Sequence, residues 1–152
     1  MLDIKIVSIG KVKEEYFNNA IQEYLKRLKP YARIEFLELK AESFNESNKD
    51  VIREVESKKI IKTLEKYHQN EVFLLHETGK ALNSLEFSKF IDQNQKIILV
   101  IGGSLGFSEE LLSKYQQISL SKLTFLHEMV KVILLEQIYR AVTILKSKNY
   151  HH

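Results

Sequence analysis

The sequence predicts an α/β protein in which a parallel sheet carries helices on both faces. Segments of strand character alternate along the chain with segments of helical periodicity, the pattern of βαβ units. Residues 97–101 form an unbroken apolar run, which is typical of a strand buried on both faces of a parallel sheet. At 152 residues without cysteine, the chain suits a single domain over residues 1–152 that needs no disulfides.

The first half of the chain begins with a strand and a helix whose ends are marked by glycine and proline. Gly10 closes the first strand, and the first helix stops before Pro30, the chain's only proline. The next strand alternates apolar and acidic residues, which indicates that one of its faces is exposed to solvent. The expected elements here are strands at 4–9 and 34–39 and helices at 14–29 and 50–67, with a polar connection at 42–49.

The second half continues the alternation and ends in a long helix. Asn83 or Ser84 can cap one helix, with Glu86 in its first turn, and Ser108 can cap a short helix that ends near Tyr115. The expected strands are 72–75, 96–101 and 118–120, with a turn at Gly79 after the first of them and a final helix at 128–146.

The final helix is apolar almost all round, more than a helix on one side of a small sheet can bury. A partner must then cover the rest, so we expect a homodimer. The alternative is a helix sunk in the core of the monomer.

Charge and hydropathy constrain the partners. The formal net charge of +3 arises from interspersed acidic and basic residues, so the charge alone does not indicate a nucleic-acid-binding protein. No apolar stretch reaches the ~18 residues of a membrane span, and no signal peptide is evident. We therefore expect a cytoplasmic protein that does not bind membranes.

A glycine-rich turn follows the apolar strand 96–101 and is the strongest local sign of a ligand site. Gly102, Gly103 and Gly106 fall within five residues, where ligands bind beyond the carboxyl ends of parallel strands. The turn lacks the lysine of a P-loop and the spacing of a dinucleotide fingerprint. A purely structural tight turn is the alternative to a ligand loop.

The segment behind this turn carries a family resemblance. Residues 118–128 (ISLSKLTFLHE), residues 132–141 (VILLEQIYRA) and the ending Asn149-Tyr150-His151 resemble the C-terminal signature of the RlmH family. These are SPOUT-class methyltransferases that methylate a pseudouridine of ribosomal RNA. The turn IGGSLG, the pair Gly10-Lys11 and the pair Gly79-Lys80 also match in order and spacing, so the resemblance spans the whole chain.

The resemblance implies a fold and a cofactor that the periodicity alone does not. The family has an α/β knot, in which the C-terminal segment threads through a loop to make a trefoil, and it forms homodimers. Its cofactor is S-adenosylmethionine, with no metal. By similarity, the cofactor-binding residues are Leu75, Gly79, Gly102, Gly103, Gly106, Leu120, Ser121, Lys122, Leu123, Thr124 and Phe125. Loops of Gly, Ser and Leu suit adenine and ribose, which need backbone polar groups and apolar walls.

The implied reaction is methyl transfer to the N3 atom of a pseudouridine in 23S ribosomal RNA, on the assembled ribosome. His127 is the candidate for moving the imide proton, although a histidine at a helix start is often structural. Arg140, Tyr150 and His151 are the residues expected to contact the nucleotide. The alternatives are that Arg140 only pairs with Glu136 four residues earlier, and that the tail is a disordered end.

Some positions depart from the family pattern, which has proline at position 126, glutamine at 128, arginine at 131, an acidic residue at 76 and glycine at 147. This chain has Leu126, Glu128, Lys131, His76 and Ser147 there. These departures affect substrate contact more than the cofactor loops. Two other functions stay open: a related knotted methyltransferase acting on transfer RNA, and a nucleotide-binding module without catalysis.

Overall fold

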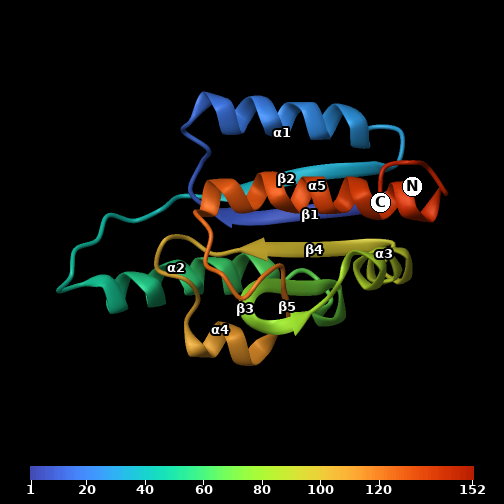
Figure 1. Cartoon of the computed structure of the whole chain (residues 1–152). Helices are drawn as coiled ribbons and strands as arrows, with labels where there is room; N and C mark the ends of the chain where they lie inside the picture. The colour runs from blue at the N-terminus through green and yellow to red at the C-terminus, as the bar shows by residue number, and fades with distance from the viewer.

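The computed structural model describes all 152 residues and confirms the parallel α/β architecture. One five-stranded sheet has the order β2-β1-β4-β3-β5, and every pair of neighbouring strands is parallel (Figure 1). The strands are β1 Leu2–Ile9, β2 Ala32–Leu39, β3 Val72–Ala81, β4 Lys96–Ile101 and β5 Gln116–Ser119. The helices are α1 Glu15–Leu28, α2 Lys49–Leu64, α3 Ser84–Gln93, α4 Glu109–Lys114 and α5 His127–Leu145, with a short 3-10 turn, η1, at Gln69–Glu71.

The two faces of the sheet bury two separate apolar clusters because side chains alternate along each central strand. On β4, Ile97, Leu99 and Ile101 join the cluster under α1, α3 and α5. Ile98 and Val100 join the cluster under α2 and α4. Figure 1 shows α1 and α5 on one side of the sheet and α2 and α4 on the other. Burial on both faces explains why this strand is an unbroken apolar run.

Local signals fix the starts of two helices as expected. The Asn83 side chain accepts a hydrogen bond from the Glu86 N–H at 2.9 Å, and the Glu86 carboxylate accepts one from the Asn83 N–H at 2.8 Å. This reciprocal pair is a capping box at the start of α3. Ser108 caps α4 by accepting from the Leu111 N–H at 3.2 Å. The two caps set where the chain leaves the loops that follow β3 and β4.

The predicted turn at Gly79 is wrong, because β3 continues through Gly79 to Ala81. The pairing of β3 with β5 shifts register between Leu75 and Lys80, so the strand bulges there. A Cβ atom on Gly79 would lie 2.7 Å from the backbone N and C atoms of Ile118. Glycine is needed at this position because β5 approaches closely.

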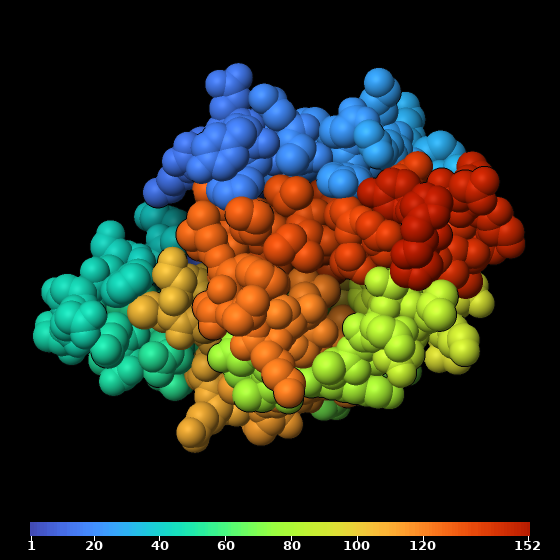
Figure 2. Space-filling view, viewed as in Figure 1, coloured from blue at the N-terminus to red at the C-terminus, as the bar shows by residue number.

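The final helix α5 packs on the sheet between α1 and α3, so the monomer buries much of its apolar surface. Leu134, Leu135, Ile138, Ala141 and Val142 are buried in the cluster on that face. An outer face stays uncovered, and Figure 2 shows it in orange to red, running across the molecule toward the C-terminus. No helix is both long and apolar enough to cross a membrane.

Candidate functional site

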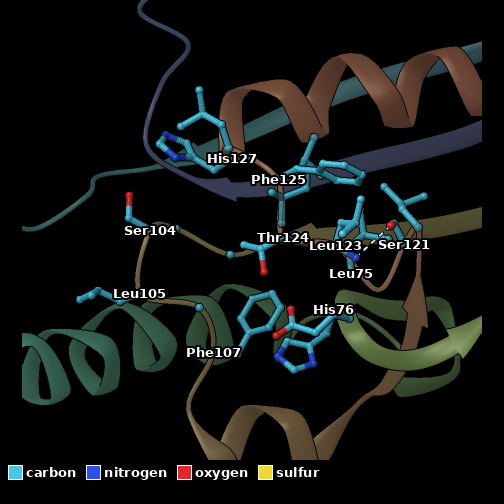
Figure 3. Close-up of a pocket in the computed structure, with 18 residues that line it drawn as sticks. Leu75, His76, Ser104, Leu105, Phe107, Ser121, Leu123, Thr124, Phe125 and His127 are labelled. Carbon is cyan, nitrogen blue, oxygen red and sulfur yellow. Dashed lines mark hydrogen bonds between the residues drawn. The ribbon is translucent and has the colours of Figure 1, made fainter.

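A cavity of about 680 Å³ lies beyond the carboxyl ends of β4 and β5 and beside residues 75–77 of β3, where the pairing of β3 with β5 shifts register. Since β4, β3 and β5 are neighbouring parallel strands, the segments after β4 and β5 meet at one edge of the sheet. Figure 3 shows the lining side chains converging from these segments and from the start of α5. The cavity is lined by Leu75, His76, Glu77, Ile101, Gly102, Gly103, Ser104, Leu105, Gly106, Phe107, Leu120, Ser121, Leu123, Thr124, Phe125, Leu126, His127 and Val130.

The glycine turn forms one wall of the cavity, and the structure explains why glycine is needed at two of its positions. Gly106 has φ +72°, in the left-handed region that other residues rarely adopt. A Cβ atom on Gly103 would lie 3.0 Å from Cγ2 of Ile9 and 3.4 Å from Oε1 of Glu56. The turn is closed by the Gly106 N–H, which donates to the Gly103 carbonyl at 3.1 Å. Glycine therefore lets this wall run close to β1.

The segment after β5 forms the opposite wall. The Ser121 hydroxyl accepts from the Leu123 N–H at 3.0 Å and so bends the chain (Figure 3). Leu123 is 71% exposed, which leaves an apolar side chain at the rim of the cavity. Leu126, where the family pattern has proline, precedes α5 with φ −56°. That angle is also the one proline favours, so leucine keeps the same entry into the helix.

Charged groups are sparse in the cavity. Glu77 is its only carboxylate, its two imidazoles belong to His76 and His127, and no lysine or arginine lines it. A site for a phosphate-rich ligand normally supplies lysine or arginine side chains. Apolar walls with exposed backbone groups suit a neutral or cationic ligand of drug-like size.

His76 is fixed by hydrogen bonds to its own strand and to β5. Its Nδ1 lies 2.7 Å from Oγ1 of Thr78, and that hydroxyl donates to Oε1 of Gln117 at 3.2 Å. The Gln117 amide is oriented by donating from Nε2 to the Leu112 carbonyl at 3.0 Å. Nδ1 of His76 also accepts a hydrogen bond from the Thr78 backbone N–H at 3.3 Å. These contacts fix the orientation of the imidazole at the cavity.

His127 begins α5 at the cavity and packs against the backbone after β1. Its Nε2 is 3.9 Å from the position a Cβ atom on Gly10 would take. Glu128, which is 5% exposed, accepts a hydrogen bond from the Lys13 N–H. Nζ of Lys131, 2% exposed, donates to Glu38 at 3.0 Å and to the Gly10 carbonyl at 3.3 Å. These contacts hold the segment after β1 beside His127.

The tail folds back on α5, so Arg140, Tyr150 and His151 do come together. Glu136 accepts from Nη2 of Arg140 at 2.5 Å and from the Tyr150 hydroxyl at 3.3 Å. The Arg140 guanidinium lies 4.9 Å from the centre of the Tyr150 ring, and Nη1 is 3.4 Å from Nδ1 of His151. Burial raises the pKa of the Tyr150 phenol to about 12, and the hydrogen bond with Tyr24 and the charge of Glu136 add to the shift. The tail therefore packs on the surface of α5.

The four residues expected to act on the nucleotide fall in two places. Arg140 lies thirteen positions after His127 on α5, which at 1.5 Å per residue is about 20 Å. His127 lies at the cavity, whereas Arg140, Tyr150 and His151 lie toward the other end of the helix. Within one chain they do not form one site.

Comparison with known proteins identifies the family of this fold. Residues 2–151 match the family model described as "Predicted SPOUT methyltransferase". The chain belongs to the SPOUT methyltransferase family. Proteins named ribosomal RNA large subunit methyltransferase H are similar over the full length. The one from Kosmotoga olearia is 38% identical over 99% of this chain and 100% of its own, and that from Enterococcus faecalis is 42% identical over 99% of each. The resemblance seen in the sequence is thus confirmed.

In this SPOUT protein, nine of the eleven residues expected to bind the cofactor line the cavity. Gly79 and Lys122 do not, since Gly79 packs on β5 and the Lys122 side chain is exposed. The expected site residues did not include eight others that line the cavity: His76, Glu77, Ile101, Ser104, Leu105, Phe107, Leu126 and Val130. Ile101, Ser104, Leu105 and Phe107 adjoin the glycines and could have been included from position alone. Val130 is one turn into α5, and only the direction of the helix brings it to the cavity.

The structure also shows the surroundings of three residues that depart from the family pattern. His76 lines the cavity, where the family pattern has an acidic residue. Lys131, itself buried, pairs with the partly exposed Glu38 where the family pattern has arginine. Ser147 has φ +52°, so a serine occupies the left-handed position after α5 where glycine is favoured. No group of three or more His, Cys, Asp or Glu side chains is arranged to hold a metal.

Proposed function

We propose that this SPOUT protein is an S-adenosylmethionine-dependent methyltransferase that methylates the N3 atom of a pseudouridine in 23S ribosomal RNA, on the assembled ribosome. The observation that carries the proposal is the cavity formed at the carboxyl ends of β4 and β5, beside residues 75–77 of β3. The names of the relatives, which specify ribosomal RNA of the large subunit, support the substrate class.

The cavity fits the proposed cofactor in its chemistry as well as its size. Leu75, Leu120 and Leu123 supply apolar surface, and the Gly102–Gly106 turn supplies backbone N–H and C=O groups. The absence of lysine and arginine suits a sulfonium, whose charge is positive. When bound, S-adenosylmethionine supplies an electrophilic methyl group, so the protein has to position the base and remove a proton from it.

We assign the removal of the imide proton from the base to His127, whose imidazole lies where the cavity meets the start of α5. An imidazole is the side chain that most often accepts or donates a proton in general acid–base catalysis. Tyr150 is unsuited to the role because its pKa of about 12 keeps the phenol protonated. The phenol and the Arg140 guanidinium instead offer a stacking surface and a phosphate-binding cation.

The two separated groups of residues, together with the uncovered face of α5, support a homodimer as the working form. Met129, Ile133, Glu136 and Arg140 recur at intervals of three and four residues along that face. Met129 is 40% exposed at the cavity end, and Arg140 marks the end of the face near the tail. If two α5 helices pair in opposite directions, the cavity end of α5 in one protomer, which carries His127, lies beside the end of the helix that carries the partner's Arg140.

Calorimetry with S-adenosylmethionine tests the cofactor. We expect binding by the unaltered protein and at least about tenfold weaker binding by Gly103→Val, because the added atoms meet Ile9 and Glu56. ATP, which shares the adenosine but adds phosphates, is the control ligand and is expected to bind far more weakly. No binding of S-adenosylmethionine, or tighter binding of ATP, would overturn the cofactor assignment.

Mass spectrometry of RNA from a strain lacking the gene tests the substrate. We expect one pseudouridine of 23S ribosomal RNA to lose a methyl group. An unchanged ribosomal map with a methyl group lost from transfer RNA would instead identify a transfer RNA methyltransferase. An unchanged map of all RNA, with cofactor binding intact, would favour a nucleotide-binding module.

Mixing two inactive variants tests the shared site. In a dimer whose sites combine both chains, His127→Ala and Arg140→Ala leave one intact site in each mixed dimer, so about a quarter of full activity returns after subunit exchange. Sites contained within single chains would give no recovery, and that result would refute the pairing of α5 helices.

A further inference from the structure

One face of α2 carries polar residues that the cofactor cavity does not use. Arg53, Glu56 and Ser57 stand at positions i, i+3 and i+4, so they share this face. Glu56 is 4% exposed and Ser57 is 1% exposed. Glutamate is rarely so buried without a partner, and none of the three residues lines the cavity. Their positions therefore call for another explanation.

Two of these residues hold the glycine turn from behind. Nε of Arg53 donates to the Leu105 carbonyl at 2.8 Å, at the tip of the turn. The Ser57 hydroxyl accepts from the Ser108 N–H at 2.8 Å, where the turn leads into α4. Leu105 itself lines the cavity, and its direct neighbours Ser104 and Gly106 do too.

Glu56 lies against the start of the turn, at Gly103. Its Oε1 is 3.4 Å from where a Cβ atom on Gly103 would be. Its Oε2 accepts from the Glu42 N–H at 3.1 Å, which fixes the carboxylate from the other side. The three side chains thus meet the turn at its beginning, its tip and its end.

We propose that Arg53, Glu56 and Ser57 are positioning residues that hold the glycine turn, residues 102–107, in its cofactor-binding conformation. They act through the turn and do not touch the cofactor. A turn rich in glycine has much conformational freedom to lose on binding, and ordering it in the free protein removes that cost. The effect on affinity rests on the proposed function, whereas the ordering of the turn does not.

The experiment compares two variants with two matched controls. Arg53→Met and Ser57→Ala remove the hydrogen bonds to the turn. Arg33→Met removes an arginine paired with Asp3 at the amino end of the sheet, and Ser88→Ala removes a buried serine that bonds to Leu85 in α3. Each protein is examined by calorimetry with S-adenosylmethionine and by amide hydrogen exchange without ligand.

We expect both variants to bind at least about fivefold more weakly, with faster exchange at 103–108 and unchanged exchange in β1 and β4. The controls are expected within twofold of the unaltered protein, and Arg53→Lys, which keeps a donor, binds more tightly than Arg53→Met. Unchanged exchange at 103–108 in both variants, or affinities within twofold, would overturn the proposal. Should the unaltered protein not bind S-adenosylmethionine, the proposed function fails, while the exchange data still decide whether α2 orders the turn.

Discussion

Replacing Gly79 by alanine tests why β3 has a glycine in its interior. The added methyl group would stand 2.7 Å from the N and C atoms of Ile118 and 2.8 Å from the C atom of Gln117. All three atoms belong to the backbone of β5, so no side-chain rotation can make room. To reach ordinary contact at 3.4 Å, β5 must move by about 0.7 Å away from β3, the strand with which it pairs.

The expected cost lies at the upper end of the range for overpacking, about 3 kcal/mol, because the obstruction is backbone. For a chain of this length each kcal/mol lowers Tm by about 2–4 °C, so we expect a fall of about 6–12 °C. Thermal and urea unfolding, followed by circular dichroism, measure it.

Gly106→Ala is the comparison, since it adds the same methyl group where no atom lies within 4 Å. Its expected cost is only that of a non-glycine residue at φ +72°, about 1 kcal/mol. A Gly79→Ala protein whose Tm stays within about 2 °C of the original, or that is more stable than Gly106→Ala, would refute the close-approach argument.

Three further predictions concern α5 and the tail. Ser147→Gly should raise Tm by about 2–4 °C, because it relieves the left-handed strain at the end of α5; a lower Tm would contradict this. Lys131→Met should lower the free energy of unfolding by about 2 kcal/mol, because it leaves Glu38 without its cation, whereas Lys131→Arg keeps the ion pair. Urea titrations measure both variants, and equal stability of the two would contradict this role of the ion pair. The raised pKa of Tyr150 stabilises the fold fully below about pH 10, and this stability is lost as the pH rises toward 12, because the unfolded chain releases the proton first. Urea midpoints that fall equally in the original protein and in Tyr150→Phe over that range would exclude the effect.

The order of strands and helices followed from local patterns because each pattern reports the environment of its own residues. Apolar runs mark doubly buried strands, as at 97–101, and capping residues such as Asn83 and Ser108 mark helix starts. The glycine turn was identifiable for the same reason, since three glycines after a buried strand have few structural explanations. The family resemblance then supplied the other cofactor loops.

The role of Gly79 and the support from α2 were hidden because they depend on contacts distant in sequence. A glycine interpreted locally suggests a turn, but here the backbone of β5 occupies the space of its side chain. Arg53, Glu56 and Ser57 read as ordinary surface residues of a helix until the fold places the glycine turn against them.

The parallel α/β class, the glycine turn and the family could be predicted from the amino acids alone, because they depend on local periodicity and on motifs of fixed spacing. Which residues share a site depends on the tertiary fold. It joined nine expected residues in one cavity, left out Gly79 and Lys122, and separated His127 from Arg140 by the length of α5 between them. The physical reason is that a site is formed by side chains whose distances depend on how strands pair and helices run.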